Sequence, residues 1–382
     1  MAHKAGLQSP YAYAGAIVTP IYGVAINYFL NRTPLAARLP IQAQGAPSFT
    51  LAGYGYRPRT SAVADANGIN NTVTTLTVSD AAAFMPGDVL EIGSEKALVT
   101  AINTTGNTLT ITRGYAGTTA AAANNADTVY VVTNTRTGAE VDVDGMKFTP
   151  TTVTQQVQTI QHPYQVGGSM ASMANFQTEP GAASPLDQYR MLAMQNCMDD
   201  IESAYYYGED VSLAADTTRP AMNGLKALLT TNNTTSPTNA SAYKPTDLER
   251  DTVQKCLDNG GQPDLLVMSS NWRLAFLQWG FPLQRLDAGA SRLGVAINSY
   301  SAPFLGDIEV VLVPGAILRP YHAVCLSSAE VNQRVKRGMF DKPRGSRGDA
   351  EEGDIIWEGA IEVRNEAHHA WLQGVTGFAA QT

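Results

Sequence analysis

The chain has 382 residues, of which 44% are hydrophobic and 16% are charged, and its formal net charge at pH 7 is −8. The hydrophobic share excludes wholesale disorder, and the length allows two or three domains. The negative balance argues against strong nucleic-acid binding, which rests on many Lys and Arg side chains at phosphates.

The first 50 residues predict an arm with one short helix rather than a folded domain. Short apolar runs alternate with prolines such as Pro20 and Pro34, which bias the residues before them toward extended backbone. Neither a signal peptide nor a run of roughly 18 apolar residues is found, so we expect no membrane partner. An arm over residues 1–50 would have little core of its own. We expect it to be stable by lying on something else, such as a neighbouring subunit.

Residues 62–135 predict a small antiparallel β barrel or sandwich that is inserted into a longer segment. The composition shifts to Thr, Ala, Val, Asn and Gly, and short period-two stretches are separated by turn sequences such as Pro86-Gly87-Asp88. Five strands are expected, at residues 73–78, 88–92, 97–102, 107–112 and 128–132.

The strongest helix signal runs from Ser184 to Tyr207. Ser184 is a favourable N-cap, Pro185 suits the first helical position, and Asp187 stands where a capping box has its acid. Gly208 is placed to end the helix. One apolar stripe follows the helical period through Leu186, Tyr189, Ala193, Cys197, Ile201 and Ala204.

The rest of the chain mixes helices and strands. Helices are expected at 246–257 and 270–279, and strands at 151–165, 264–268, 307–313, 321–326 and 355–363. In the last strand, apolar residues such as Trp357 alternate with Glu358 and Glu362, which predicts one dry and one wet face. The chain as a whole is therefore predicted to be α+β with an all-β insertion.

No catalytic, cofactor-binding or metal site is predicted. Cys197, Cys256 and Cys325 form neither a close pair in the sequence nor a metal-binding spacing, so we expect reduced, buried thiols. His368 and His369 should point to opposite sides of a strand, away from a shared ligand. Nucleophile elbows, phosphate-binding loops and dinucleotide fingerprints are absent, and we do not expect an enzyme.

The densest charge cluster lies between residues 334 and 354. Basic residues come first and acidic residues follow, and glycines are interspersed. Two interpretations stay open: the cluster pairs with a complementary block on a neighbouring copy, or it is a mobile, solvated loop. Its members are Arg334, Lys336, Arg337, Lys342, Arg344, Arg347, Asp349, Glu351, Glu352 and Asp354.

The order of arm, long extended excursion, long central helix, mixed α/β region and returning strand resembles the Hong Kong 97-like major capsid proteins of tailed phages. The segment 157–168 and the insertion sequences 84–92 and 112–118 are similar to a branch that carries a β domain in the extended loop. The resemblance implies an N-terminal arm (1–50), an extended loop (51–165) with the inserted domain (62–135), a peripheral domain (166–218) with its spine helix (184–207), an axial domain (219–342) and closing peripheral strands (343–382).

The resemblance also implies a function. The expected protein is a major capsid protein that assembles as hexamers and pentamers into the icosahedral head around phage double-stranded DNA. It would be made and assembled in the host cytoplasm and found in the virion. The implied partners are further copies of the chain, a separate scaffolding protein, a portal protein and, optionally, a decoration protein, with packaged DNA contacted weakly.

Three alternatives stay beside this expectation. An encapsulin-like nanocompartment shell protein and a phage tail or decoration protein would both be structural. A hydrolase with an unrecognised site is disfavoured because no base–nucleophile pairing is visible.

Overall fold

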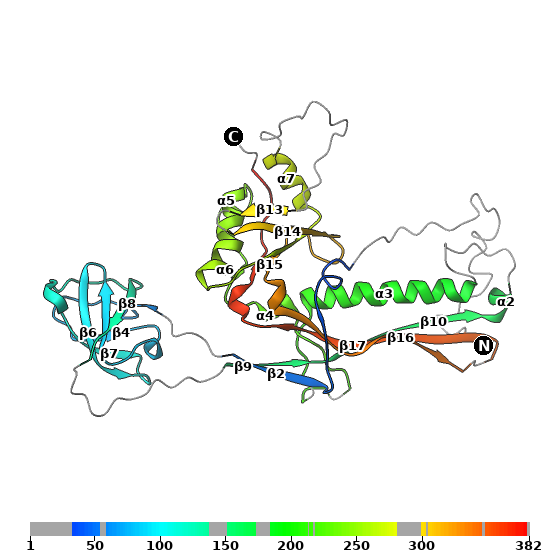
Figure 1. Cartoon of the computed structure of the whole chain (residues 1–382), viewed down its shortest axis with the longest axis horizontal. Helices are drawn as coiled ribbons and strands as arrows, with labels where there is room; N and C mark the ends of the chain where they lie inside the picture. Colours follow the sequence, from blue (N-terminus) through cyan, green and yellow to red (C-terminus); the bar gives the residue numbers. More distant parts are fainter. Residues whose placement is uncertain are drawn as a thin grey trace. The chain divides into compact units, whose positions relative to one another are not determined.

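The computed structural model describes residues 33–53, 59–136, 151–172, 184–212, 214–216, 218–280, 299–302, 305–345 and 348–379 (Figure 1). Two compact units are present: a main unit of Met1–Leu51 with Val153–Thr382, and an inserted unit of Ala52–Thr152. None of the helices described has the length and apolar character of a membrane span.

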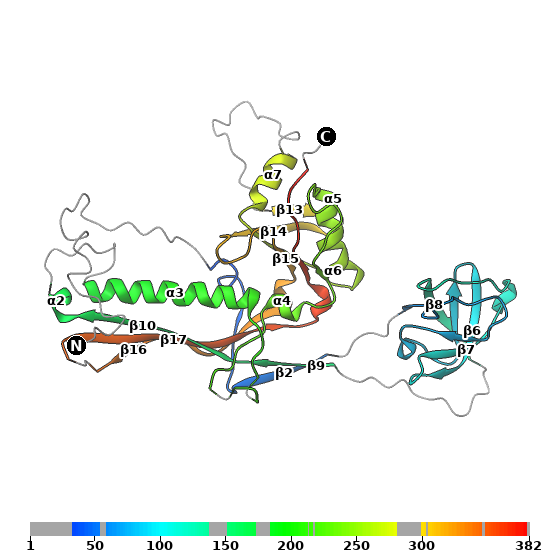
Figure 2. The same cartoon turned by 180° about the vertical axis from the view of Figure 1, so that it is seen from behind.

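The first layer of the main unit is a four-stranded sheet with a long helix, α3, lying against it (Figure 2). The strand order is β1-β16-β17-β10; β17 pairs antiparallel with both of its neighbours, and β1 pairs parallel with β16. The bounds are β1 Ile41–Ala43, β10 Gln158–Gly167, α2 Gly168–Ala171, α3 Pro185–Tyr207, β16 Val331–Arg344 and β17 Ala350–Val363.

Helix α3 has the ends that the sequence predicts. The Ser184 hydroxyl oxygen accepts the Asp187 N–H at 3.2 Å, and the hydroxyl donates to the Asp187 carboxylate at 2.8 Å. At the other end, the Gly208 N–H donates to the Ala204 carbonyl. A Cβ at Gly208 would lie 2.5 Å from the Met222 carbonyl oxygen, so the close approach of the next segment requires glycine here.

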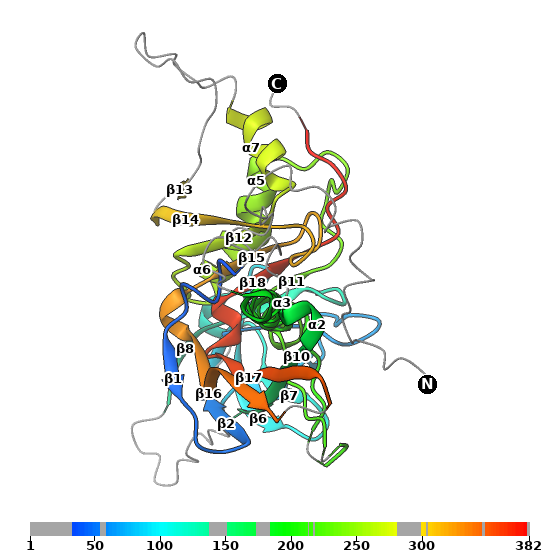
Figure 3. The ribbon, with the colours of Figure 1, turned by 90° about the vertical axis from the view of Figure 1, so that its right-hand side faces the viewer.

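The second layer is a six-stranded sheet with the order β11-β18-β15-β12-β14-β13 (Figure 3). Its strands are β11 Asn233–Thr234, β12 Leu265–Ser269, β13 Ser299–Ala302, β14 Gly306–Val313, β15 Ala323–Leu326 and β18 Ala370–Leu372. The helical segments of this part of the chain are α4 Leu225–Leu228, α5 Pro245–Leu248, η4 Glu249–Val253, α6 Gln254–Asp258, α7 Trp272–Gly280, η6 Ser328–Glu330 and η7 Glu366–His368.

Two local predictions differ from this layer. The helix expected over 246–257 contains a π-helical turn, η4, where buried Asp251 accepts the Tyr243 hydroxyl and the Arg250 guanidinium. His368 and His369 stand in and just after a 3₁₀ turn, not on a strand. His369 is buried and accepts the Ser327 N–H, which ties this turn to the sheet.

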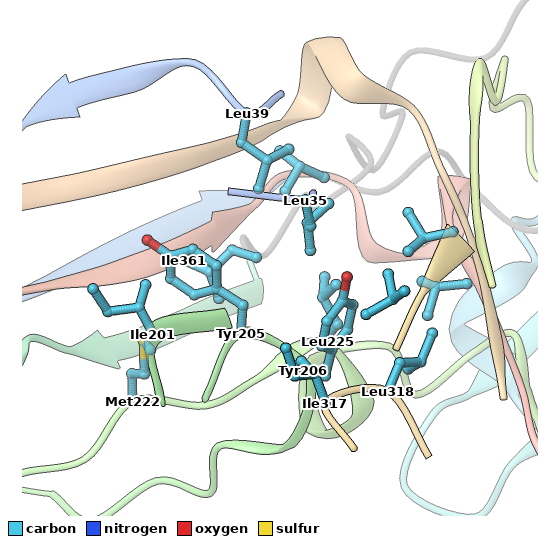
Figure 4. Close-up of a cluster of buried hydrophobic side chains, with 14 of the residues drawn as sticks. Leu35, Leu39, Ile201, Tyr205, Tyr206, Met222, Leu225, Ile317, Leu318 and Ile361 are labelled. Atoms are coloured by element: carbon cyan, nitrogen blue, oxygen red, sulfur yellow. The ribbon is translucent and has the colours of Figure 1, made fainter. Parts of the chain in front are cut away.

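Two strands pair in a different sheet from the one that the expected domain boundary implies. β16 begins at Val331, inside the predicted axial range 219–342, yet it pairs in the first sheet. β18, inside the predicted closing range 343–382, pairs in the second sheet. A single cluster of buried hydrophobic residues joins the two layers, and it includes Ile201 of α3 and Val324 of β15 (Figure 4).

The prediction of a coreless arm over residues 1–50 is wrong for residues 33–43. Leu35 and Leu39 are 0% and 4% exposed and lie in the core of the main unit (Figure 4). They come four residues apart in a single helical turn, a spacing that the neighbouring prolines obscured in the sequence. Further on, β2 (Ser48–Gly53) pairs with β9 (Thr151–Gln156). Residues 1–32 lie outside the described part of the chain.

The inserted unit is a closed six-stranded barrel. Its strand order is β3-β8-β5-β6-β7-β4, and a bridge between Val63 and Val78 joins the two outer strands. The five strands expected from the sequence are present, and β3 is a sixth. The bounds are β3 Thr60–Ala62, β4 Thr75–Thr77, η2 Ala81–Ala83, β5 Asp88–Ile92, β6 Glu95–Asn103, β7 Thr108–Thr112, η3 Tyr115–Gly117 and β8 Thr128–Asn134.

A buried ion pair holds one end of the barrel together. Arg113 binds the Glu95 carboxylate through two hydrogen bonds of 2.7 and 2.5 Å and also donates to the Asn70 and Val73 carbonyls. Burial opposes the charge on Glu95, but the hydrogen bonds from Arg113 and from the Ala121 N–H keep its pKa below the ordinary value. The Gly114 N–H donates to the same carboxylate at 3.0 Å, so Arg113 and Gly114 both belong to this network.

Replacement of Arg113 by Met should destabilise the barrel by about 3–5 kcal/mol, because it leaves the Glu95 carboxylate buried without its cation. Hydrogen exchange of the β5 and β6 amides in the full-length chain should speed up accordingly. Lys96→Met is the matched control. The Lys96 side chain is 37% exposed and its Nζ lies 3.7 Å from the Glu91 carboxylate, so we expect its loss to destabilise the barrel by less than about 1 kcal/mol. Equal exchange in the two variants would contradict the prediction.

Candidate assembly surface

The predicted charge cluster lies on a β hairpin. β16 and β17 pair antiparallel over most of their length, with Lys342 opposite Asp354 and Arg344 opposite Glu352. Arg334, Lys336, Arg337, Lys342 and Arg344 lie on β16, Asp349 lies in the turn, and Glu351, Glu352 and Asp354 lie on β17. Arg347 lies outside the described residues.

Three carboxylates on one face of β17 are paired with arginines of β16. Arg344 binds Asp354, Arg337 binds Glu358, and Arg334 binds Glu362. We call these six residues the charge ladder. Lys336 lies 3.6 Å from Glu358, and Arg364 donates to Glu362 at 2.8 Å.

The charge ladder overturns the prediction that Glu358 and Glu362 lie on a wet face. They are only 7% and 1% exposed, because β10 and β16 flank β17 and the arginine side chains extend over its acidic face. The opposite face is also buried: the Trp357 ring packs edge-on against the Tyr205 ring of α3, with 6.1 Å between the ring centroids. β17 is therefore covered on both faces from Gly353 to Val363.

Two of the ladder acids, Glu358 and Glu362, are held as carboxylates. The hydrogen bond from Arg337 lowers the pKa of Glu358, against the effect of burial. Burial opposes ionisation of Glu362 too, but Arg334 and Arg364 keep its pKa below the ordinary value. The cations, by contrast, reach solvent: the side chains of Arg337 and Arg344 are 50% and 49% exposed. The ladder therefore presents guanidinium groups to solvent, and its buried acids are ion-paired with these groups.

Other polar contacts of the hairpin come from segments that the sequence did not connect with it. The Tyr164 hydroxyl of β10 donates to Asp341 at 2.7 Å, and Arg190 of α3 binds the same carboxylate at 2.9 Å. The Tyr164 ring covers Gly353, where a Cβ would lie 2.2 Å from its hydroxyl oxygen. The register of the sheet and the packing of α3 against it bring these distant segments together, so no local sequence signal could have revealed them.

The last residue of α3 connects the two layers. The Tyr207 hydroxyl lies 2.9 Å from His322 Nδ1 and accepts the Arg319 N–H at 2.9 Å. The Arg319 guanidinium stacks over the Tyr207 ring, and Trp371 of β18 meets that ring edge-on. Burial, together with the positive charges of Arg319 and Lys226, lowers the pKa of His322 to about 4.

The described residues form no recognisable metal-binding site. No three His, Cys, Asp or Glu side chains among them are placed to hold a metal ion. Cys197, Cys256 and Cys325 are all buried, as the sequence predicts. The structure adds one contact that their spacing did not suggest: a hydrogen bond with Cys256, together with burial, raises the pKa of Cys325.

The low pKa of His322 predicts a pH dependence of stability. Between about pH 6.5 and 4 the unfolded chain binds a proton at this histidine that the folded chain excludes. The free energy of unfolding should therefore fall as the pH is lowered through this window, and it should keep its full value above it. In His322→Gln this component is absent, and the slope should be shallower.

Urea unfolding of the unassembled chain, monitored by tryptophan fluorescence at several pH values, would measure how the free energy of unfolding changes with pH. All four tryptophans lie in the main unit, so the barrel does not contribute to the signal. Identical pH slopes for the wild-type chain and His322→Gln would refute the assignment.

The fold is similar to that of a phage capsid chain. The structure aligns with a chain of the cyanophage A-1(L) capsid asymmetric unit at a TM-score of 0.56 and 11% identity, covering 97% of this chain and 100% of that chain. Chains from Microbacterium phage Oxtober96 and Mycobacterium phage Adephagia align at TM-scores of 0.47 and 0.46, with 10% and 12% identity. These alignments cover 96% and 98% of this chain and 98% and 94% of the other chains, respectively.

Sequence comparison gives the family. No curated protein sequence matches the chain. The model of the SU10 major capsid protein family matches residues 26–376, which include most of the main unit, the inserted barrel and the charge ladder. The chain therefore belongs to the SU10 major capsid protein family and is a phage major capsid protein of the virion.

Proposed function

We propose that copies of this chain associate as hexamers and pentamers into the icosahedral head that encloses phage double-stranded DNA. The family match over residues 26–376 carries the proposal. Because identical subunits close a shell by repeating the same contacts under symmetry, the chain needs surfaces that suit other copies of itself.

The main unit offers such surfaces. β10 pairs with β17 on one side, and no strand of the described residues pairs with its other side. An open strand edge is a place where another chain can add backbone hydrogen bonds. Ile41 of β1 and Leu274 of α7 are large apolar residues that are 70% and 61% exposed in the single chain. The six strands described for the barrel close through the bridge between Val63 and Val78, and we expect the barrel to take a smaller part in the shell contacts.

The remaining partners follow from the same proposal. A net charge of −8 suits loose contact with packaged DNA, since tight binding requires many cations at phosphates. A separate scaffolding protein, a portal protein and, optionally, a decoration protein would complete the head. The nanocompartment and tail-protein alternatives are not favoured, because the matching family is one of phage major capsid proteins.

Electron microscopy tests the proposal directly. The full-length chain, expressed with and without the other head proteins of its phage, should form closed shells of uniform diameter. Chains that remain monomeric at high concentration in both preparations would overturn it.

We further propose that the hairpin pairs with acidic groups of a neighbouring copy. The acids of the charge ladder already have cations within their own chain, whereas Arg337 and Arg344 remain half-exposed and Lys342 is exposed. A cationic surface on a chain of net charge −8 suits contact with the prevailing negative charge of other copies.

Reversal of the charge in Lys342→Glu should therefore weaken assembly at low salt, and more so than neutralisation in Lys342→Gln. Because exposed charges are screened at higher ionic strength, the gap between the two variants should narrow as salt is added. Light scattering during assembly would measure both effects. A Lys342→Glu chain that assembles like Lys342→Gln at low salt would argue against inter-subunit pairing at this position.

A further inference from the structure

Residues 33–43 contact elements of both layers of the main unit. Residues 33–39 form a helical turn, in which the Ala37 N–H donates to the Thr33 carbonyl and the Leu39 N–H to the Leu35 carbonyl. β1 follows and pairs with β16. We call residues 33–43 the clasp, and three polar side chains from α3, β16 and β14 bind it.

Glu202 of α3 caps the start of this turn. One carboxylate oxygen accepts the Leu35 N–H and the other accepts the Ala36 N–H, each at 2.9 Å. The Tyr206 hydroxyl donates to the same carboxylate at 3.0 Å. The first N–H groups of a helical turn have no partner within the turn, and an acidic side chain usually satisfies them locally. Here the acid comes from a helix 167 residues away in sequence, and it is completely buried.

Gln333 of β16 holds the other end of the turn. Its side-chain amide donates to the Ala36 carbonyl at 2.6 Å and to the Leu39 carbonyl at 2.9 Å. Its amide oxygen accepts the Tyr205 hydroxyl of α3 at 3.0 Å, and its backbone N–H donates to the Pro40 carbonyl. Every polar group of this buried side chain therefore has a partner, and two of its bonds go to carbonyls that the turn leaves open.

The second layer takes part through β14. Arg38 binds Glu309 at 2.7 Å, while Leu35 and Leu39 enter the core that both layers share (Figure 4). The ion pair is exposed and contributes little by itself. Its importance is positional, because it attaches the turn to the six-stranded sheet while Glu202 and Gln333 attach it to the other layer.

We propose that the clasp holds the α3 layer and the six-stranded sheet of one subunit in a single relative orientation, and that uniform shell diameter depends on it. The part that concerns the shell rests on the proposed function. The clasp has little turn-stabilising sequence of its own, and its conformation depends on distant buried groups. We therefore expect it to open separately from the rest of the main unit, and a change in the orientation of the two layers to alter the angle between neighbouring subunits.

Two variants open the clasp from opposite sides. Glu202→Gln keeps the shape of the side chain but directs an N–H group at one of the clasp N–H donors, which leaves a buried donor unsatisfied. Leu35→Ala removes an apolar contact from the clasp and leaves α3, β16 and β14 unchanged in sequence. Glu209→Gln is the matched control, the same chemical change at an exposed residue just beyond α3.

Tryptic cleavage after Arg38 in the unassembled full-length chain reports opening, because Leu39 is buried in the closed clasp. Loss of one buried hydrogen bond should raise the cleavage rate roughly tenfold in Glu202→Gln. Leu35→Ala, which leaves a cavity in place of a fully buried side chain, should raise it by more than about tenfold. Glu209→Gln should cleave at the wild-type rate. Far-ultraviolet circular dichroism should show that each variant keeps α3.

Electron microscopy of the assembled variants then tests the second half of the proposal. We expect Glu202→Gln and Leu35→Ala shells to vary in diameter, and Glu209→Gln shells to match the wild type. Wild-type cleavage rates in both clasp variants would overturn the clasp itself. Fast cleavage with uniform shells of wild-type diameter would overturn its role in orientation. If the wild-type chain forms no shells, the proposed function fails, and the cleavage rates still decide for or against the clasp.

Discussion

The main unit depends on one constraint, which is that β17 is buried on both faces from Gly353 to Val363 while this stretch carries three carboxylates. A buried strand with Asp354, Glu358 and Glu362 is stable only if each charge is neutralised in place. The arginines of β16 meet this requirement, so the pairing register of the hairpin and the positions of its charges determine each other. The other face of the strand is then available for α3, and the remaining contacts of the layer follow from that packing.

The two units differ in whether their edge strands are paired. The inserted barrel closes on itself through the bridge between Val63 and Val78, and its own buried arginine holds one end together. The first sheet of the main unit leaves β10 with an open side among the described residues. Closure suits a module that folds independently, whereas an open edge suits a subunit whose stable state includes other copies.

Much of the fold could be predicted from the sequence because the signals were local. The caps at Ser184 and Gly208 set the limits of α3, and alternating residues with tight turns gave the strands of the barrel. The candidate site was predicted less well. The sequence located the basic residues of the hairpin but placed Glu358 and Glu362 on a wet face, because alternation of charged and apolar residues does not say what covers the charged side. The clasp was missed because its partners, Glu202 and Gln333, are more than 160 residues away.

By itself, the sequence determined the α+β class, the ends of the long helix, the inserted β module and the resemblance to phage capsid proteins. These depend on neighbours along the chain, on capping, periodicity and turn chemistry. The tertiary structure decided which charges are buried, which strands belong to which sheet, and that residues 33–43 fold onto their own chain. Those outcomes depend on pairing between distant segments, since a carboxylate can be buried or exposed in the same local sequence according to whether the fold brings a cation to it.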